Sequence, residues 1–333
     1  MADIVRGTGV LSFPWPTIDP FLFCAHHDDA YPRGNEAQAP AVSLAGRKLG
    51  MDFSQRDGFS MYHGETVPGF PQHPHRGFET ITLVRKGLID HSDSLGATAR
   101  FGGGDVQWMT AGRGIQHAEM FPLVHEDADN PLELFQIWLN LPAADKMVDP
   151  YFTMLWADTI PVIEAKGSRV AVVAGSIGAV AGPRTPPNSW AARSESDIGV
   201  YTVTLDAGAS VTLPPARPGT NRVVYFFEGR SAEVGGRALS SHTVVHVRED
   251  HPLTMTGGAD GADMLVLQGR PIGEPVVHHG PFVMNTKAEI QQAIADYRAT
   301  QFGAWPWPSP GPVHARSQER FAVHADGTRE TTG

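Results

Sequence analysis

The sequence contains one cysteine, Cys24, among its 333 residues. A single thiol cannot build an internal disulfide framework or a zinc site made of several cysteines. We interpret Cys24 as an inert packed residue rather than a nucleophile, because the sequence places no base beside it. The shortage of thiols favours a reducing compartment, so we expect a cytoplasmic protein.

The sequence also lacks long apolar runs and an excess of positive charge. No stretch of about 18 apolar residues occurs, and no apolar core follows a basic patch at the N-terminus, so we expect neither a membrane span nor a signal peptide. Lys and Arg total 26 against 36 Asp and Glu, which gives a net charge of −10. Because binding to nucleic acid backbones depends on clustered cations, we expect no direct nucleic acid partner.

The chain is rich in residues that punctuate short strands, with 36 Gly and 27 Pro. Strand-like segments separated by turns run from Phe78 to about Leu139, and a second set follows, including "GVYTVTLDAGASVTL" and "RVVYFFEGR". Two successive all-β sets predict two tandem β-barrels of the jelly-roll type. We place an N-terminal barrel at residues 1–145, a C-terminal barrel with a helix at 146–303, and a Pro-rich tail at 304–333 that either straps onto the body or frays.

One helix is expected near the C-terminus, in "NTKAEIQQAIADYRATQFG". Thr286 and Glu289 have the spacing of a capping box, and Gly303 is placed to end the helix. An apolar stripe formed by Ile290, Ile294 and Tyr297 should pack against the body of the protein.

The residues suited to chemistry lie in two short segments. "QHPHRGFET" places His73 and His75 two positions apart, and "GIQHAEM" places His117 and Glu119 at the same spacing. Residues i and i+2 of a strand share a face, so two adjacent strands would direct three imidazoles and one carboxylate to one point. Such a set would leave coordination positions open on a metal that prefers five or six ligands. Glu79 has the parity of the first pair, which makes it a supporting acid, an alternative ligand or a hydrogen-bonded barrel residue.

The second set of strands has no comparable combination of histidines and a carboxylate, so we expect the C-terminal barrel to hold no metal. A purely structural role for the first site is disfavoured, because structural zinc sites are closed tetrahedra of Cys and His.

Several segments together resemble the pirin family of the cupin superfamily. They are "DPFL", "GFPQHPHRGFETITLV", "HSDSLG", "GDVQWMTAGRGIQHAEM" and "EPVVHHGPFVMNTKAEI". The resemblance implies a bicupin of two barrels packed face to face, with one metal ion in the N-terminal barrel held by His73, His75, His117 and Glu119. Iron is the metal that the resemblance favours, and Zn, Mn, Cu or Ni are alternatives.

The resemblance also implies two functions. One is a dioxygenase of the quercetin 2,3-dioxygenase type, in which the metal would acidify the hydroxyl of a flavonol-like hydroxy-keto substrate and Glu119, or Glu79 behind it, would accept the proton. The other is a non-enzymatic, metal-dependent regulatory protein that binds a protein partner. An oxygenase needs a cavity leading to the metal, whereas a regulator can keep its metal under a closed rim.

Overall fold

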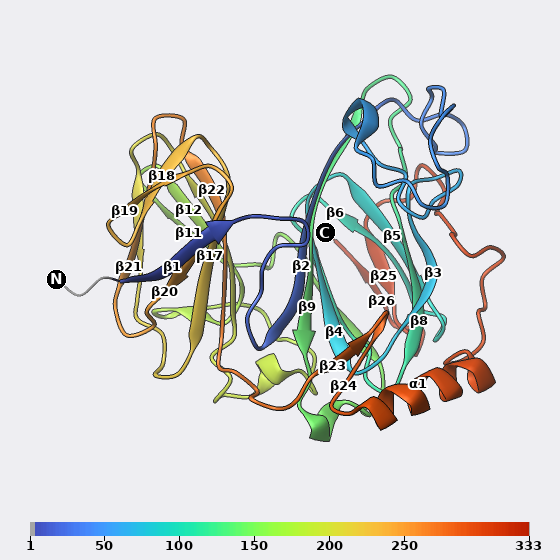
Figure 1. Cartoon of the computed structure of the whole chain (residues 1–333). Coiled ribbons are helices and arrows are strands. Elements are labelled where there is room, and N and C mark those ends of the chain that lie inside the picture. The colour runs from blue at the N-terminus through green and yellow to red at the C-terminus, as the bar shows by residue number, and fades with distance from the viewer. Residues whose placement is uncertain (1–3, 333) are drawn as a thin grey trace. The chain divides into compact units, whose positions relative to one another are not determined.

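A computed structural model describes residues 4–332 of the chain, which form two compact units (Figure 1). We call them the N-terminal barrel (His26–Ile137, Leu141–Ala157 and 274–332) and the C-terminal barrel (4–25, Trp138–Asn140 and Asp158–Gly273). Each unit is built of β-sheets, so the all-β, two-barrel architecture expected from the sequence is confirmed.

The N-terminal barrel is formed by a five-stranded sheet of order β10-β7-β4-β9-β2 and a six-stranded sheet of order β26-β25-β6-β5-β8-β3, with β23 and β24 as a separate pair. Strands β2 and β9 continue past the boundary into the other unit. The strands are β2 (Phe21–Tyr31), β3 (Gly69–His75), β4 (Phe78–Lys86), β5 (Leu88–Asp93), β6 (Thr98–Gly102), β7 (Val106–Thr110), β8 (Ile115–Met120), β9 (Asn130–Asn140), β10 (Tyr151–Leu155), β23 (Val277–His279), β24 (Phe282–Met284), β25 (Phe321–Val323) and β26 (Arg329–Thr331).

The C-terminal barrel combines a seven-stranded sheet of order β1-β20-β17-β22-β15-β12-β11 with a four-stranded sheet of order β16-β21-β18-β19, and β13 pairs with β14. Its strands are β1 (Val5–Val10), β11 (Val162–Ala165), β12 (Ser168–Ala174), β13 (Ser176–Ile177), β14 (Val180–Ala181), β15 (Gly199–Leu205), β16 (Ser210–Leu213), β17 (Asn221–Glu228), β18 (Ser231–Val234), β19 (Arg237–Ser240), β20 (Thr243–Val247), β21 (Leu253–Gly257) and β22 (Ala262–Gly269). The described chain also contains three short 3-10 helices: η1 (Arg56–Gly58), η2 (Ala143–Asp145) and η3 (Trp190–Ala192).

Each barrel encloses its own apolar core. The inward-facing side chains of the N-terminal barrel include Ile89, Phe101 and Met109, all fully buried. Those of the C-terminal barrel include Val224 and Val266. Alternating strand residues supply both cores, which is the pattern that closed sheets require.

The pairing of the first and last strands differs from the boundaries expected from the sequence. Strand β1, near the N-terminus, pairs with β20 of the C-terminal barrel, and β25 pairs with β6 of the N-terminal barrel. Residues 274–332, which include the helix, therefore belong by their contacts to the N-terminal barrel. From the sequence we expect the helix in the C-terminal barrel, whereas its packing partners lie in the N-terminal barrel.

The helix itself, α1 (Lys287–Thr300), confirms the expected capping box at Thr286 and Glu289. Ile290 is buried in a small cluster with Phe282 and Phe302, and the half-buried Ile294 and Tyr297 pack against this cluster. The helix ends before Gly303, because Gln301 and Phe302 already adopt left-handed backbone conformations. No helix in the described part of the chain has the length and apolarity needed to cross a membrane.

The C-terminal segment is held against the N-terminal barrel by hydrogen bonds from a buried arginine. Arg100 and Asp90 are both fully buried, and the guanidinium donates to both carboxylate oxygens at 2.6 and 2.7 Å. Arg100 also donates to the carbonyls of Ala315 and Gln318, at 2.9 and 3.0 Å. The described tail is therefore part of the barrel wall.

Candidate metal centre

Three histidines meet where strands β3 and β8 pair. The strands are antiparallel, and His73 lies directly opposite His117 after a register shift between Phe70 and His73. His75 follows on the same face of β3, and one ring nitrogen of each histidine lies within 4.8 Å of the others. The sequence predicts that the two short motifs converge, and the three imidazoles do so. Together they could hold a metal ion.

Glu119 lies at the edge of this cluster. It follows His117 by two residues on β8, and its Oε2 lies 3.8 Å from His117 Nε2. The other carboxylate oxygen, Oε1, accepts a hydrogen bond of 2.7 Å from Thr82 Oγ1 on β4. Glu119 therefore has one oxygen fixed by a hydroxyl and one directed at the histidines.

Burial keeps the three imidazoles in the neutral form, which suits a cation. Desolvation lowers the pKa of His73 to about 4 and holds those of His75 and His117 well below their usual range. Desolvation also raises the pKa of Glu119. His73 Nδ1 lies 2.9 Å from the Pro71 carbonyl, and since that oxygen only accepts, Nδ1 carries the proton and Nε2 keeps its lone pair. Neutral imidazoles are the form that binds metals.

The cluster fits a divalent transition metal on a second ground. His117 is fully buried, yet neither of its ring nitrogens has a hydrogen-bond partner among the described residues. An unsatisfied buried polar group costs about 1–3 kcal/mol, so an ion at this position would remove a penalty that the protein otherwise bears. Imidazole nitrogens with a carboxylate suit Fe, Mn, Ni, Cu and Zn alike.

Glu79 does not join this cluster, so the parity argument for it is wrong. Strand β3 ends at His75, and Gly77, with φ of 86°, turns the chain into β4 of the other sheet. A Cβ on Gly77 would lie 2.0 Å from the Val283 carbonyl oxygen, so the turn requires glycine. Thr82 faces Glu119, and Glu79, three residues before it, lies on the opposite face of β4, where Thr110 Oγ1 donates to it at 2.7 Å.

Two polar side chains near the cluster were missed as functional candidates. His91 on β5 lies opposite Glu119, with its ring centroid 5.6 Å from that of His117. Gln107 on β7 lies opposite Thr82, is almost completely buried, and has no hydrogen-bond partner for either amide atom among the described residues. That Gln107 lies on the same face as Thr82 can be seen only when the register between β4 and β7 is known.

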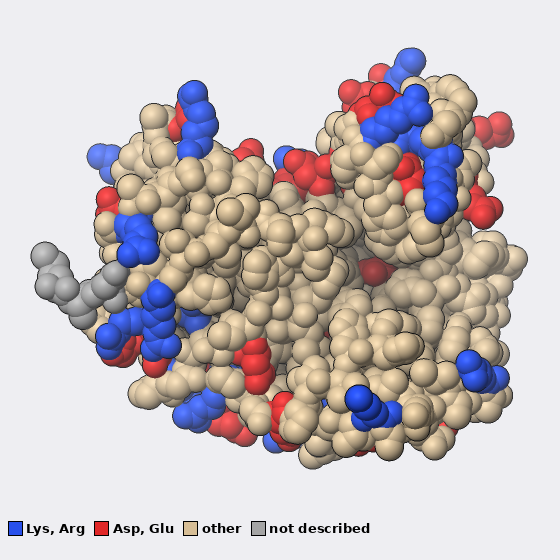
Figure 2. Space-filling view, in the orientation of Figure 1, with Lys and Arg blue, Asp and Glu red and all other residues tan. Residues whose placement is uncertain are grey.

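The cluster is closest to solvent on the side of His73. His73 is half-buried, and Glu119 retains 5% of its surface. Figure 2 shows that the surface of the N-terminal barrel is hollowed, with an acidic side chain visible in the hollow.

Comparison with known proteins agrees with this fold. A family model described as pirin matches residues 12–139, and one described as the pirin C-terminal cupin domain matches residues 200–303. The chain belongs to the pirin family. The resemblance noted from the sequence motifs is thereby confirmed.

Named relatives cover most of the chain. A Pseudomonas aeruginosa protein named as a candidate quercetin 2,3-dioxygenase is 38% identical over 244 residues, which is 70% of this chain and 79% of that protein. Human pirin is 35% identical over 256 residues, which cover 74% of this chain and 81% of human pirin. The solved structure of a quercetin 2,3-dioxygenase from Acinetobacter baumannii superposes with a TM-score of 0.71 and is 28% identical in sequence. The match covers 90% of this chain and 98% of that chain.

Proposed function

We propose that this pirin-family protein is a metal-dependent dioxygenase of the quercetin 2,3-dioxygenase type, acting on a flavonol-like hydroxy-keto substrate. The observation that supports the proposal most is the buried group of His73, His75 and His117, with Glu119 beside it. The names of the Pseudomonas and Acinetobacter relatives point to the same reaction. We assign the metal to these four residues, with iron as the expected ion and Zn, Mn, Cu or Ni as alternatives.

A divalent ion in this position would supply Lewis acidity that lowers the pKa of a substrate hydroxyl, together with the means to react with dioxygen. The chain's own contribution begins with Glu119. Burial raises the pKa of this carboxyl, which suits it to accept a proton from the substrate hydroxyl. Thr82, by donating to Oε1 at 2.7 Å, fixes the carboxylate so that Oε2 faces the reacting group.

Neighbouring side chains would orient the substrate and keep water out. Gln107, on the same face as Thr82, offers an amide donor and an acceptor that are not used by other described residues. A flavonol carries adjacent carbonyl and hydroxyl oxygens, and an amide can bind one of each. The buried core residues Met109 and Phe152 supply an apolar surface for the rings.

The test is oxygen uptake with quercetin by protein loaded separately with each of the five metals, with metal content measured in parallel. Glu119→Gln should retain more metal than activity, because an amide oxygen remains a weak ligand but cannot accept a proton. The matched control is Glu79→Gln, which changes a buried glutamate on the far face of β4. It should retain both properties.

Absence of oxygen uptake with any metal and any flavonol would refute the dioxygenase proposal. Metal-dependent binding of a protein partner without turnover would then support the regulatory alternative.

Since Cys24 is the only cysteine and is fully buried, we also infer that the protein works in the cytoplasm.

A further inference from the structure

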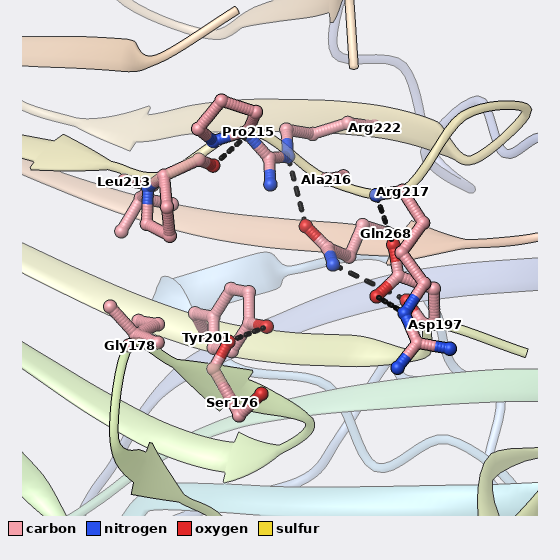
Figure 3. A pocket seen from close by; sticks show the side chains of 12 residues that line it. Ser176, Gly178, Asp197, Tyr201, Leu213, Pro215, Ala216, Arg217, Arg222 and Gln268 are labelled. Atoms are coloured by element: carbon pink, nitrogen blue, oxygen red, sulfur yellow. Dashed lines mark hydrogen bonds and ion pairs between the residues drawn. The ribbon is translucent and has the colours of Figure 1, made fainter. Parts of the chain in front are cut away.

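A pocket of about 260 Å³ opens at one end of the inner face of the C-terminal barrel. Three adjacent strands, β17, β22 and β15, supply its polar side chains Arg222, Gln268 and Tyr201 (Figure 3). Arg222 lies opposite Gln268 in the register, and Tyr201 lies opposite Val266. All these side chains share one face, and because Tyr201 and Val266 belong to the barrel core, that face is the interior.

Arg222 is a buried cation that no carboxylate balances directly. Only 4% of the residue is exposed. Its Nε donates to Gln268 Oε1 at 2.9 Å and its Nη1 to the Pro214 carbonyl at 3.0 Å, and no ion pair joins it to any described acid. Its remaining nitrogen, Nη2, points into the pocket on the side of Tyr201 (Figure 3). Buried charges in proteins are normally paired, so this arrangement requires an explanation.

The one acid that lines the pocket, Asp197, is already engaged. Its Oδ2 accepts hydrogen bonds from Thr220 Oγ1 at 2.8 Å and from the Arg217 backbone N–H at 2.9 Å, and Oδ1 lies 4.0 Å from Arg217 Nε. The lining therefore carries two arginines and one aspartate, a net charge of one positive unit. Arg217 and Asp197 offset one another at the rim, which leaves the charge of Arg222 for a ligand.

The rest of the lining is apolar or weakly polar and includes Ile177, Leu213, Pro214 and Pro215. Gln268 offers a second donor, since its Nε2 makes one long hydrogen bond of 3.3 Å to the Asp197 carbonyl and has another N–H. We propose that this pocket binds a small monocarboxylate with an apolar body, held by Arg222 Nη2 and Gln268 Nε2. One unpaired cation selects a single negative charge, and the prolines and Leu213 cover the apolar part.

The electrostatics of the residue agree with this assignment. Burial lowers the pKa of Arg222, because the pocket solvates the charged guanidinium less well than water does, and the nearby Asp197 and Glu249 oppose this shift. A bound carboxylate would replace part of the lost solvation with a charge-assisted hydrogen bond. The assignment is independent of the metal and of the dioxygenase proposal, since every residue that carries it lies in the C-terminal barrel.

The experiment is calorimetric titration of the full chain with benzoate as the probe. A ligand of this size in a preformed pocket should bind with a Kd of about 1 mM or tighter. Benzamide, which has the same shape without the charge, should bind at least about tenfold more weakly if the unpaired guanidinium provides the affinity.

Two variants locate the site. Arg222→Met should abolish benzoate binding, and Ala216→Trp should do the same by filling the pocket while leaving Arg222 in place. Ala216 is half-buried, and its backbone N–H donates to the Glu249 carbonyl at 2.8 Å, a bond that the substitution preserves. This second variant serves if the first fails to fold. The matched control is Arg230→Met, which removes an exposed arginine of the same barrel paired with Asp260 at 2.7 Å.

The expected result is binding by wild type and Arg230→Met, and a loss of at least tenfold in the two pocket variants. Unchanged affinity in Ala216→Trp would overturn the proposal, because benzoate would then bind elsewhere. Equal affinity for benzoate and benzamide, or no saturable binding of benzoate by wild type, would overturn it as well.

Discussion

His117→Ala separates the structural cost of this residue from its role in metal binding. In metal-free protein, removal of the buried imidazole leaves a cavity, which costs about 2–4 kcal/mol. The same change removes two ring nitrogens that have no hydrogen-bond partner among the described residues, a relief of about 1–3 kcal/mol each. Because these two terms oppose each other, we expect the metal-free variant to lie between about 2 kcal/mol less stable and about 4 kcal/mol more stable than wild type.

With metal present, the two proteins should differ strongly. A metal at about one thousand times its Kd stabilises the folded wild type by about 4 kcal/mol, and a domain of this size gains about 2–4 °C in Tm per kcal/mol. Wild type should therefore show a metal-induced rise of about 8–16 °C in the unfolding of the N-terminal barrel. His117→Ala should lose nearly all of this rise.

The assay is thermal unfolding with and without Fe(II) under anaerobic conditions, repeated with Ni(II). His91→Ala is the matched control, because His91 is also fully buried in the same barrel, 5.6 Å from the His117 ring between centroids, but is not assigned as a ligand. It should keep the metal-induced rise. A rise in His117→Ala equal to that of wild type would refute the assigned ligand set, and a metal-free variant destabilised by far more than about 2 kcal/mol would refute the argument from unsatisfied nitrogens.

Three further outcomes follow from buried positions. Gly77→Ala should destabilise the protein by more than about 3 kcal/mol in urea unfolding, because its Cβ would meet the Val283 carbonyl at 2.0 Å. Burial raises the pKa of Asp29 to about 6, so the folded state holds this proton more tightly than the unfolded state, and wild-type stability should fall as the pH rises from about 4 to 6. Asp29→Asn should lack that part of the fall when urea midpoints are compared across this range. Burial raises the pKa of Cys24, so Ellman's reagent should label it in urea and leave the native protein unlabelled.

The convergence of the three histidines could be predicted because it depends only on strand alternation and on two neighbouring strands. His73 and His75 share a face of β3 whatever the rest of the fold does, and β8 presents His117 by the same rule. The position of Glu79 could not be predicted by extending that rule. Alternation carries across a continuous strand, and the chain changes sheets at Gly77, where its backbone has a positive φ.

The sequence predicts that there are two barrels, but it does not predict which segments of the chain belong to each. Strand β25 has three residues, and its pairing with β6 is decided by contacts distant in sequence, among them those between Arg100 and the carbonyls of Ala315 and Gln318. A short strand in a Pro-rich segment has no periodicity that indicates its partner. Helix α1 was predictable from its caps and apolar stripe, but which barrel it covers depends on Phe282 and Phe302, which flank it.

The two barrels share a fold and differ in the polar residues at their inward-facing positions. In the N-terminal barrel those positions hold His73, His117 and Glu119, a set of acceptors that calls for a cation. In the C-terminal barrel they hold Arg222 and Gln268, which offer unused donors and a positive charge that call for an anion. The sequence "NRVVYFFEGR" conceals this difference, because an arginine near the start of a strand is ordinarily solvated. Only the pairing of β17 with β22 shows that Arg222 faces the interior, so the ligand preference of each barrel follows from a few inward-facing side chains and not from the fold.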